Sequence, residues 1–126
     1  MPAIWEGEFD ATCYTRILHR NLIPSARAFY PSGHWWLLQD NAPQHTSAAT
    51  RDWLHNNGVD CLDFPPLSPD LNPIENLWAD LKRRVEAHRP RTIAELEACI
   101  RLEWQATPLI LLRSLAHSMP ARLAAV

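Results

Sequence analysis

The stretch LQDNAPQHTS, residues 38–47, follows a run of large apolar residues with an acid, an amide, a proline and a histidine. The segment HWWLLQD (34–40) is short, aromatic and bounded by turn residues. This pattern predicts a buried strand with Asp40 as its last residue. An acid at the end of a buried strand is a candidate for chemistry.

Helices are predicted on both sides of this strand. The first is capped by Asp10, carries apolar residues at spacings of three and four, and is expected to stop before Pro24. The second is expected to begin at a cap on Thr46 or Ser47 and to end at the NNG of residues 56–58, whose asparagines and glycine favour a left-handed backbone. The strand is therefore expected to be flanked by helices.

A second strand, VDCLDF (59–64), is predicted before the proline-rich segment FPPLSPDLNP (64–73). Proline fixes φ and lacks a donor, so this segment is expected to be a stiff loop without regular structure. Asn72 is then a good N-cap with Pro73 at the first helical position, which predicts a helix to about Ala87. Its expected buried stripe consists of Ile74, Leu77, Trp78, Leu81 and Val85.

Two further helices complete the predicted order α-β-α-β-α-α-α. One begins at a capping box formed by Thr92 and Glu95, and a last one follows Pro108. The 126 residues fit one domain at most, without repeats or an internal boundary, and 47% hydrophobic residues with six tryptophans suffice for a core. The sequence therefore predicts a globular α/β chain.

Composition excludes several classes of protein. No stretch approaches the roughly 20 consecutive apolar residues of a membrane span, and the start MPAIWEGEFD does not resemble a signal peptide. We therefore expect an intracellular chain without a membrane partner. Cys13, Cys61 and Cys99 are widely spaced and lack a CxxC motif, so buried, reduced thiols are expected rather than disulfides or a zinc site.

Charge is unevenly distributed along a chain whose net charge is only −2. The segment 52–80 contains acids but no lysine or arginine, and the next stretch reverses the sign. A metal site beside a polyanion and a solvated helix face with mixed charges both explain this pattern. The basic stretch, which opposes only Glu86, consists of Lys82, Arg83, Arg84, Arg89 and Arg91.

Asp40 and Glu75 are acids expected at the ends of elements that border the stiff loop. Carboxylates held on rigid elements can share a Mg²⁺ ion, with phosphate oxygens completing its shell. Structural explanations stay open for both acids. Glu75 occupies the capping-box position after Asn72, and Asp40 can form a turn through Asn41.

QDNAPQHTS (39–47) and FPPLSPDLNPIENLWADLKRRV (64–85) resemble the DDE catalytic domain of Tc/mariner transposases. The resemblance runs from about Gly7 to the C-terminus and implies a ribonuclease H-like α/β fold. It implies that Asp40 and Glu75 are the second and third catalytic acids, which bind Mg²⁺ or Mn²⁺ in that family. Asn41 and His45 match motif residues near the active site. The loop that delivers the glutamate is matched by Pro69, Asp70, Asn72 and Pro73.

The sequence departs from the family at its beginning. The family's first catalytic aspartate lies on an opening strand, well before the helix expected at Asp10, and the N-terminal DNA-binding region of the family has no match. Asp10 serves better as an N-cap than as a replacement. Residues 1–126 are therefore expected to be a partial DDE domain, truncated at its N-terminal strands, with a helix-rich C-terminal half and an exposed sheet edge.

The leading expectation is a fragment of a cut-and-paste DNA transposase that is inactive alone. Two alternatives stay open, a nucleic-acid-binding module without chemistry and a module that forms homo-oligomers through the exposed sheet edge. DNA is the expected partner, through the basic stretch. The expected location is the nucleus in a eukaryote and otherwise the cytoplasm.

Overall fold

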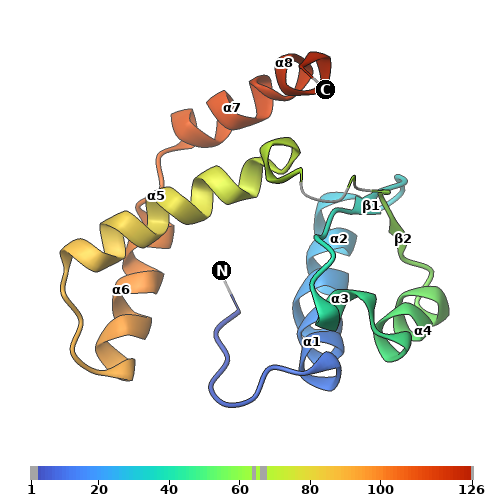
Figure 1. The fold of residues 1–126 in the computed structure, drawn as a ribbon, viewed down its shortest axis with the longest axis horizontal. Helices are drawn as coiled ribbons and strands as arrows, with labels where there is room; N and C mark the ends of the chain where they lie inside the picture. The colour runs from blue at the N-terminus through green and yellow to red at the C-terminus, as the bar shows by residue number, and fades with distance from the viewer. Residues whose placement is uncertain (1–2, 64, 66–67, 126) are drawn as a thin grey trace. The chain divides into compact units, whose positions relative to one another are not determined.

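The computed structural model describes residues 3–63, 65 and 68–125. Two compact parts make up the chain (Figure 1). The N-terminal unit comprises the described residues from Trp5 to Pro65, and the C-terminal unit comprises residues 68–125 together with Ala3 and Ile4. Within the described residues, no helix is long and apolar enough to cross a membrane.

A continuous helical segment opens the N-terminal unit. Asp10 caps helix α1 (Ala11–Ile17) by accepting a hydrogen bond of 2.8 Å from the Cys13 N–H, as predicted. The predicted stop before Pro24 was wrong, because the chain continues through a π-helical turn, η1 (Leu18–Leu22), into α2 (Ile23–Phe29). In the wider turn the Ile23 N–H bonds to the Leu18 carbonyl. Pro24 then falls in the first turn of α2, where its missing donor is tolerated.

The two predicted strands are present but much shorter than expected. Strand β1 (Trp36–Leu37) pairs in parallel with β2 (Asp60–Cys61), in the register Trp36 to Asp60 and Leu37 to Cys61. Asp40 is therefore not the last residue of a strand but lies in the loop beyond it. Only two residues of each strand are paired. Within the described residues, the rest of each apolar run has no partner in the parallel ladder and is therefore not part of a strand. Phe64 of the predicted second strand lies outside the described residues.

Two helices follow β1. The short helix α3 (Pro43–Thr46) was not predicted, whereas α4 (Ala48–Asn56) begins at the predicted cap, where Ser47 Oγ accepts a hydrogen bond of 3.2 Å from the Thr50 N–H. Gly58, at φ +63°, follows α4 as expected. Leu18, Leu54 and Val59 form the buried core between this helix and α1.

The long helix α5 (Pro73–Ala87) dominates the C-terminal unit and has the predicted bounds. It is preceded by a 3₁₀ turn, η2 (Pro69–Leu71), so the expectation of no regular structure in the proline-rich loop was wrong for these residues. Proline suits the first turn of a 3₁₀ helix for the same reason as in an α-helix. Pro66 and Leu67 of that loop lie outside the described residues. Leu77, Leu81 and Val85 of the expected stripe are buried and Ile74 is half-buried, but the expectation was wrong for Trp78, which is 40% exposed.

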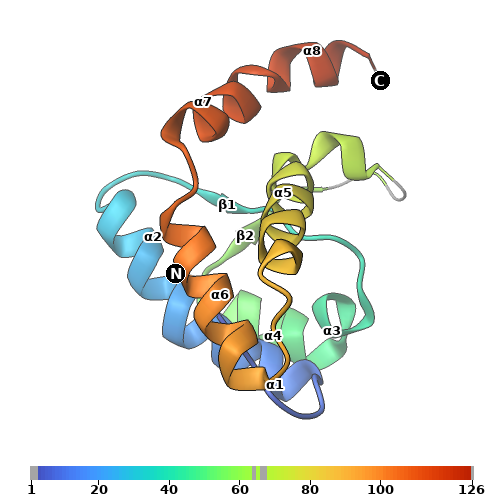
Figure 2. The same ribbon diagram turned by 90° about the vertical axis from the view of Figure 1, so that its left-hand side faces the viewer.

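Three helices complete this unit. Thr92 caps α6 (Ile93–Gln105), but the Glu95 carboxylate accepts from the Arg91 N–H at 2.7 Å instead of from Thr92 as a capping box would require. The single helix predicted after Pro108 is instead two, α7 (Leu109–His117) and α8 (Met119–Ala124), which meet at Ser118 (Figure 2). Pro120 explains the break, because its ring is tolerated only in the first turn of a new helix.

An ion cluster joins α5 to α6. The Arg84 guanidinium donates to Asp80 at 2.9 Å, to both the carboxylate and the backbone carbonyl of Glu103 at 2.7 Å, and to Thr107 at 2.9 Å. Only 18% of the Arg84 side chain is exposed. His88 adds a second contact of 2.7 Å to Glu103. We call these five residues the Arg84 cluster.

Reduced thiols are present, as expected, but their burial differs. All three cysteines are free. Cys13 is buried, Cys99 is half-buried, and Cys61 is exposed because it lies on a sheet of only two described strands. The expectation of burial was therefore wrong for Cys61.

The Arg84 cluster predicts an acid-sensitive C-terminal unit. Hydrogen bonds from Arg83 and Arg84 lower the pKa of Asp80 below its usual 3.8, and those from His88 and Arg84 lower the pKa of Glu103 below its usual 4.5. A carboxyl group whose pKa is lower in the folded than in the unfolded state stabilises the fold at pH values above its unfolded-state pKa. This stabilisation is lost as the pH falls through the folded-state pKa. We expect the free energy of unfolding to drop below about pH 4.5, and to drop less steeply in Glu103→Gln. Urea denaturation between pH 3 and 6 measures this. The exposed-pair variant Glu97→Gln is the control, and a Glu103→Gln profile parallel to the wild-type one would contradict the prediction.

Candidate active site

Asp40 lies in an exposed loop between β1 and α3, with 58% of its side chain accessible. One carboxylate oxygen, Oδ1, accepts a hydrogen bond of 3.1 Å from the Ala42 N–H, which is the turn expected through Asn41. The same oxygen lies 2.6 Å from Nδ1 of His45. Among the described residues Oδ2 has no partner, so the turn leaves one carboxylate oxygen of Asp40 without a hydrogen bond.

His45 is brought to Asp40 by the short helix α3. Its side chain is 19% exposed, and its ring packs against the ring of Tyr14 from α1, with centroids 4.3 Å apart. Tyr14 in turn donates a hydrogen bond of 2.6 Å from its hydroxyl to Oε1 of Gln39, and burial raises the pKa of Tyr14 to about 12. Asn41 is exposed in the same loop. The predicted neighbour His45 is therefore in contact with Asp40.

Tyr14 and Gln39 were not identified as site residues from the sequence. In the sequence, Tyr14 is one of the apolar positions of the first predicted helix, and Gln39 is the residue before Asp40. The closest signal was the polar side chain of Gln39 at the end of an apolar run. The contact itself joins positions 25 residues apart, which helical periodicity does not reveal.

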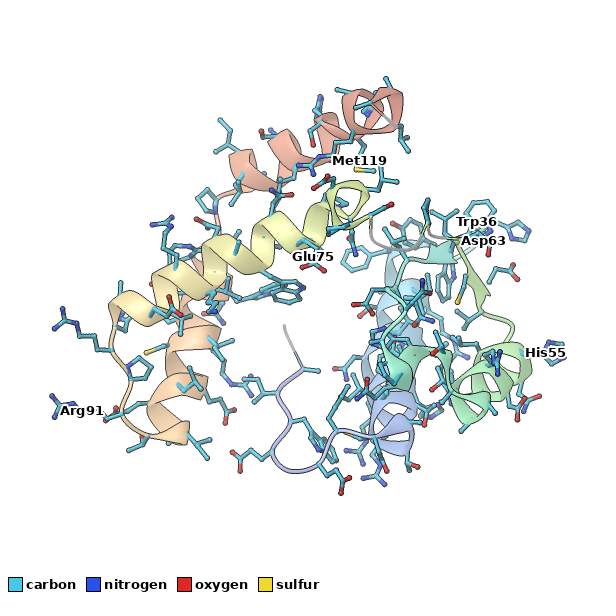
Figure 3. The ribbon with its side chains drawn as sticks, in the orientation of Figure 1. Trp36, His55, Asp63, Glu75, Arg91 and Met119 are labelled. Atoms are coloured by element: carbon cyan, nitrogen blue, oxygen red, sulfur yellow. The ribbon has the colours of Figure 1, made fainter. Side chains whose placement is uncertain are left out.

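Glu75 is exposed in the first turn of α5 (Figure 3). The capping-box alternative for this residue is wrong, because the N–H of Asn72 already donates to the Pro69 carbonyl at 3.0 Å and closes the 3₁₀ turn. The Asn72 side chain caps α5 instead by accepting from the Ile74 N–H. Within the described part of the chain the Glu75 carboxylate makes no hydrogen bond or ion pair.

The two acids fit a hard divalent cation by the chemistry of their donors. Each presents carboxylate oxygen without a partner among the described residues, the ligand type that Mg²⁺ and Mn²⁺ prefer. No group of three or more His, Cys, Asp or Glu residues that could hold a metal occurs in residues 3–63, 65 and 68–125. Asp40 belongs to the N-terminal unit and Glu75 to the C-terminal unit, so a shared ion stays a prediction.

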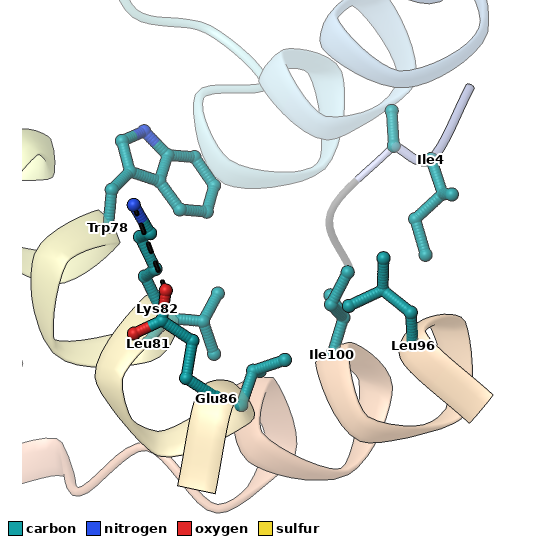
Figure 4. Close-up of a pocket in the computed structure, with 9 residues that line it drawn as sticks. Ile4, Trp78, Leu81, Lys82, Glu86, Leu96 and Ile100 are labelled. Carbon is teal, nitrogen blue, oxygen red and sulfur yellow. Dashed lines mark ion pairs between the residues drawn. The ribbon is translucent and has the colours of Figure 1, made fainter. Parts of the chain in front are cut away.

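The basic stretch divides into engaged and accessible side chains. Arg84 belongs to the Arg84 cluster, where its side chain is only 18% exposed and pairs with Asp80 and Glu103. Arg83 pairs with Asp80 at 2.6 Å but is 74% exposed, and Lys82 pairs loosely with Glu86 at 3.8 Å (Figure 4). The side chains of Arg89 and Arg91 are exposed and have no acidic partner among the described residues (Figure 3).

An apolar groove lies beside these cations. It has a volume of about 440 Å³ between α5 and α6, with Trp78 on one wall, Leu96 and Ile100 on the other, and Ile4 at its edge (Figure 4). Trp78 also stacks on Trp104 at 5.6 Å. Lys82 also lines this groove, so one of the accessible cations borders the face of α5 that packs against α6.

Residues 2–97 match the family described as DDE superfamily endonuclease. The transposable element Tcb1 transposase of Caenorhabditis briggsae is 37% identical over 120 residues, covering 95% of this chain and 44% of the relative. The transposable element Tc1 transposase of Caenorhabditis elegans is 42% identical over 88 residues, covering 70% of this chain and 32% of the relative. The chain thus spans less than half the length of these curated relatives.

Solved structures of the Mos1 transposase catalytic domain have a similar fold. One contains raltegravir with Mn and superimposes with a TM-score of 0.79 at 24% identity, covering 92% of this chain and 60% of that chain. Another, with Mg, gives a TM-score of 0.70 at 27% identity over the same shares. This likeness confirms the ribonuclease H-like fold class, in a helix-rich form with a small sheet.

The geometry of α5 predicts different costs for two neighbouring substitutions. Asn72→Ala should lower the free energy of unfolding by about 1 kcal/mol, because it removes an N-cap. Glu75→Gln should change it by about 0.5 kcal/mol or less, since only an exposed charge near the helix N-terminus is lost. Urea denaturation at pH 7 measures both. A loss for Glu75→Gln equal to that for Asn72→Ala would restore a structural role for the glutamate.

Proposed function

The chain belongs to the DDE superfamily of endonucleases, and from this premise we propose that it is the C-terminal part of a Tc/mariner transposase catalytic domain. The observation that carries the proposal is the state of its two acids. Asp40 keeps one carboxylate oxygen free, and Glu75 has no structural partner among the described residues. On a transposase-like fold, carboxylate oxygens without a protein partner can bind a divalent cation, and that cation can in turn bind a phosphate.

In this proposal Asp40 and Glu75 are metal ligands for the cutting and joining of DNA strands by the whole transposase. A bound Mg²⁺ or Mn²⁺ would polarise the scissile phosphate as a Lewis acid. The loop after β1 and the first turn of α5 hold the two carboxylates, and Asn41 and His45 border the first of them. The relatives are nematode transposases, so we place the action of this chain in the nucleus.

We further propose that residues 1–126 alone do not cleave DNA. The family's first catalytic acid, from its opening strand, has no match in this sequence, and Asp10 is used as the N-cap of α1. Two carboxylates without a third leave a metal-assisted site incomplete. The whole domain therefore needs an acid from outside this sequence.

A manganese titration tests the assignment of the two acids. The chain should bind Mn²⁺ weakly, with a Kd on the order of 1 mM for a site with few charged ligands, and Asp40→Ala and Glu75→Ala should each reduce the binding. Electron paramagnetic resonance of free Mn²⁺ measures this, with Asp52→Ala as the control. A supercoiled plasmid included in parallel should remain uncut. Mn²⁺ binding that both variants leave unchanged would contradict the metal-ligand role of the two acids. Nicking of the plasmid by the wild-type chain that both variants abolish would contradict the proposal that residues 1–126 alone do not cleave DNA.

DNA contact is proposed through the accessible cations of the basic stretch. Lys82, Arg83, Arg89 and Arg91 remain candidates, whereas Arg84 is left out because its donors are used within the Arg84 cluster. The left-handed backbone of Arg89, at φ +52°, turns the chain after α5 and separates Arg91 from the helix. Phosphate contacts of this kind carry no sequence information.

The salt dependence of DNA binding tests this surface. If about three cations contact phosphates, the slope of log K against log salt should be roughly −3, because each contact contributes about −0.9. The triple variant Lys82→Gln, Arg83→Gln, Arg91→Gln should flatten most of that slope. The matched control replaces Arg20, Arg27 and Arg51, which removes the same charge from the N-terminal unit. Fluorescence anisotropy measures the slopes, and equal slopes for the two triple variants would refute the surface.

A homo-oligomer is the second candidate, favoured by the surface beside β1. Trp36 is 60% exposed and Phe29 is 78% exposed, at a groove of about 410 Å³ between α2 and β1. Residues 28–39 contain no formally charged side chain. This sheet edge therefore lacks the charged residues, such as lysine, that usually prevent an edge strand from pairing with another chain. Without cations the surface suits a second copy of the chain better than DNA.

Sedimentation velocity tests this interface. We expect a dimer that forms with increasing concentration and is lost in Trp36→Lys, because a charge placed on each facing copy is repelled and desolvated. The control is Ile110→Lys, which changes an equally apolar residue that is 79% exposed on α7. A monomer at all concentrations, or a dimer that both variants preserve, would exclude pairing through this edge.

A further inference from the structure

The Asp40 carboxylate is contacted by one backbone N–H and one side chain, although it lies in an exposed loop. Its Oδ1 receives the Ala42 N–H and the His45 Nδ1, and Nδ1 also lies 3.2 Å from the Asp40 carbonyl. In the tautomer that carries its proton on Nδ1, His45 donates this short contact to the Oδ1 acceptor. One oxygen of the carboxylate is thereby held by two donors.

We propose that Tyr14, Gln39 and His45 form a bracket that orients the Asp40 carboxylate, holding Oδ1 and presenting Oδ2 to a divalent cation. The bracket rests on the proposed function in one respect only, namely that Asp40 is a metal ligand. Tyr14, Gln39 and His45 are positioning residues, since they act through Asp40.

The bracket is built from the helix α1 outward. The Tyr14 ring supports the His45 ring at 4.3 Å with an interplanar angle of 35°, and the Tyr14 hydroxyl donates to Gln39 Oε1 at 2.6 Å. Gln39 Nε2 then reaches the His45 carbonyl at 3.5 Å. Tyr14 therefore supports Asp40 by two routes, through the His45 ring and through the neighbouring residue Gln39. Hydrogen bonds of this kind to a ligating carboxylate fix its orientation and support metal affinity.

Anchoring of the loop does not explain the bracket, because α3 is held by other contacts. Gln44 Nε2 donates to the Phe9 carbonyl at 3.1 Å, and the fully buried Thr50 donates to the Gln44 carbonyl at 2.6 Å. These bonds fasten α3 to the N-terminal unit without Asp40. The contact between His45 and Asp40 is thus available to set the direction of the carboxylate.

Solvent exchange of the Ala42 amide reports on the bracket without metal, because this N–H donates to Asp40 Oδ1. In NMR spectra of the whole chain, His45→Ala should speed this exchange roughly fivefold, as expected for the loss of a hydrogen bond of about 1 kcal/mol. Tyr14→Phe keeps the ring and should give a smaller increase. His45→Asn keeps a donor near the position of Nδ1 and should restore most of the protection. The controls are His55→Ala, on an exposed histidine of α4 (Figure 3), and Tyr30→Phe.

Paramagnetic broadening by Mn²⁺ alone provides the second readout. The resonances of residues 40–42 should broaden in the wild-type chain, and His45→Ala should require about fivefold more Mn²⁺, with rescue by His45→Asn. Far-UV circular dichroism identifies variants that fail to fold. If His45→Ala does not fold, Tyr14→Phe tests the bracket in its place.

The outcomes separate the bracket from the proposed function. Ala42 exchange in folded His45→Ala that equals that in His55→Ala overturns the bracket. A loss that His45→Asn does not rescue also overturns it, because ring packing alone would then explain the effect. If Ala42 responds as expected but Mn²⁺ broadens no resonance of the wild-type chain, the bracket stands and the metal-ligand role of Asp40 fails.

Discussion

The missing N–H of proline is the constraint on which the rest of this structure depends. Among the residues that the structure describes, five prolines occupy the first turn of a helical segment, where no donor is required: Pro24, Pro43, Pro69, Pro73 and Pro120. Pro43 begins the short helix that brings His45 to Asp40. Pro69 and Pro73 set the turn and the helix start between which Asn72 is capped and Glu75 is presented. Each of the two candidate acids therefore has a helix-initiating proline two or three residues away in the chain, Pro43 after Asp40 and Pro73 before Glu75.

The parts of the fold that rest on local chemistry were predictable from the sequence. Ser47 and Asn72 cap the helices that their side chains predict, and α5 has the expected bounds. Strand length was not predictable, because it depends on pairing with a distant segment: only two residues of β1 meet β2. The continuation of the helix through Pro24 was not predicted either. The π-helical turn before the proline lets the helix continue, and this turn cannot be recognised from the spacing of the apolar residues.

The candidate site shows the same division. Asp40 and Glu75 were identified as candidate ligands from motif and spacing, but the reason for the availability of Glu75 lies in a backbone bond of Asn72 that no pattern reveals. Arg84 looks like its basic neighbours in the sequence and differs from them because Glu103 of α6 and Thr107 just after α6 accept its hydrogen bonds. A run of cations along a helix therefore overstates the charge that a polyanion meets.

The backbone of Arg89 has a consequence for the balance between stability and charge in this chain. A left-handed φ of +52° is where helices commonly end in glycine, and a side chain there costs about 1 kcal/mol. Selection for stability alone would favour glycine at this corner. The chain instead keeps a guanidinium at the turn where α5 ends, so its conformational strain is concentrated on an exposed cation rather than in its core.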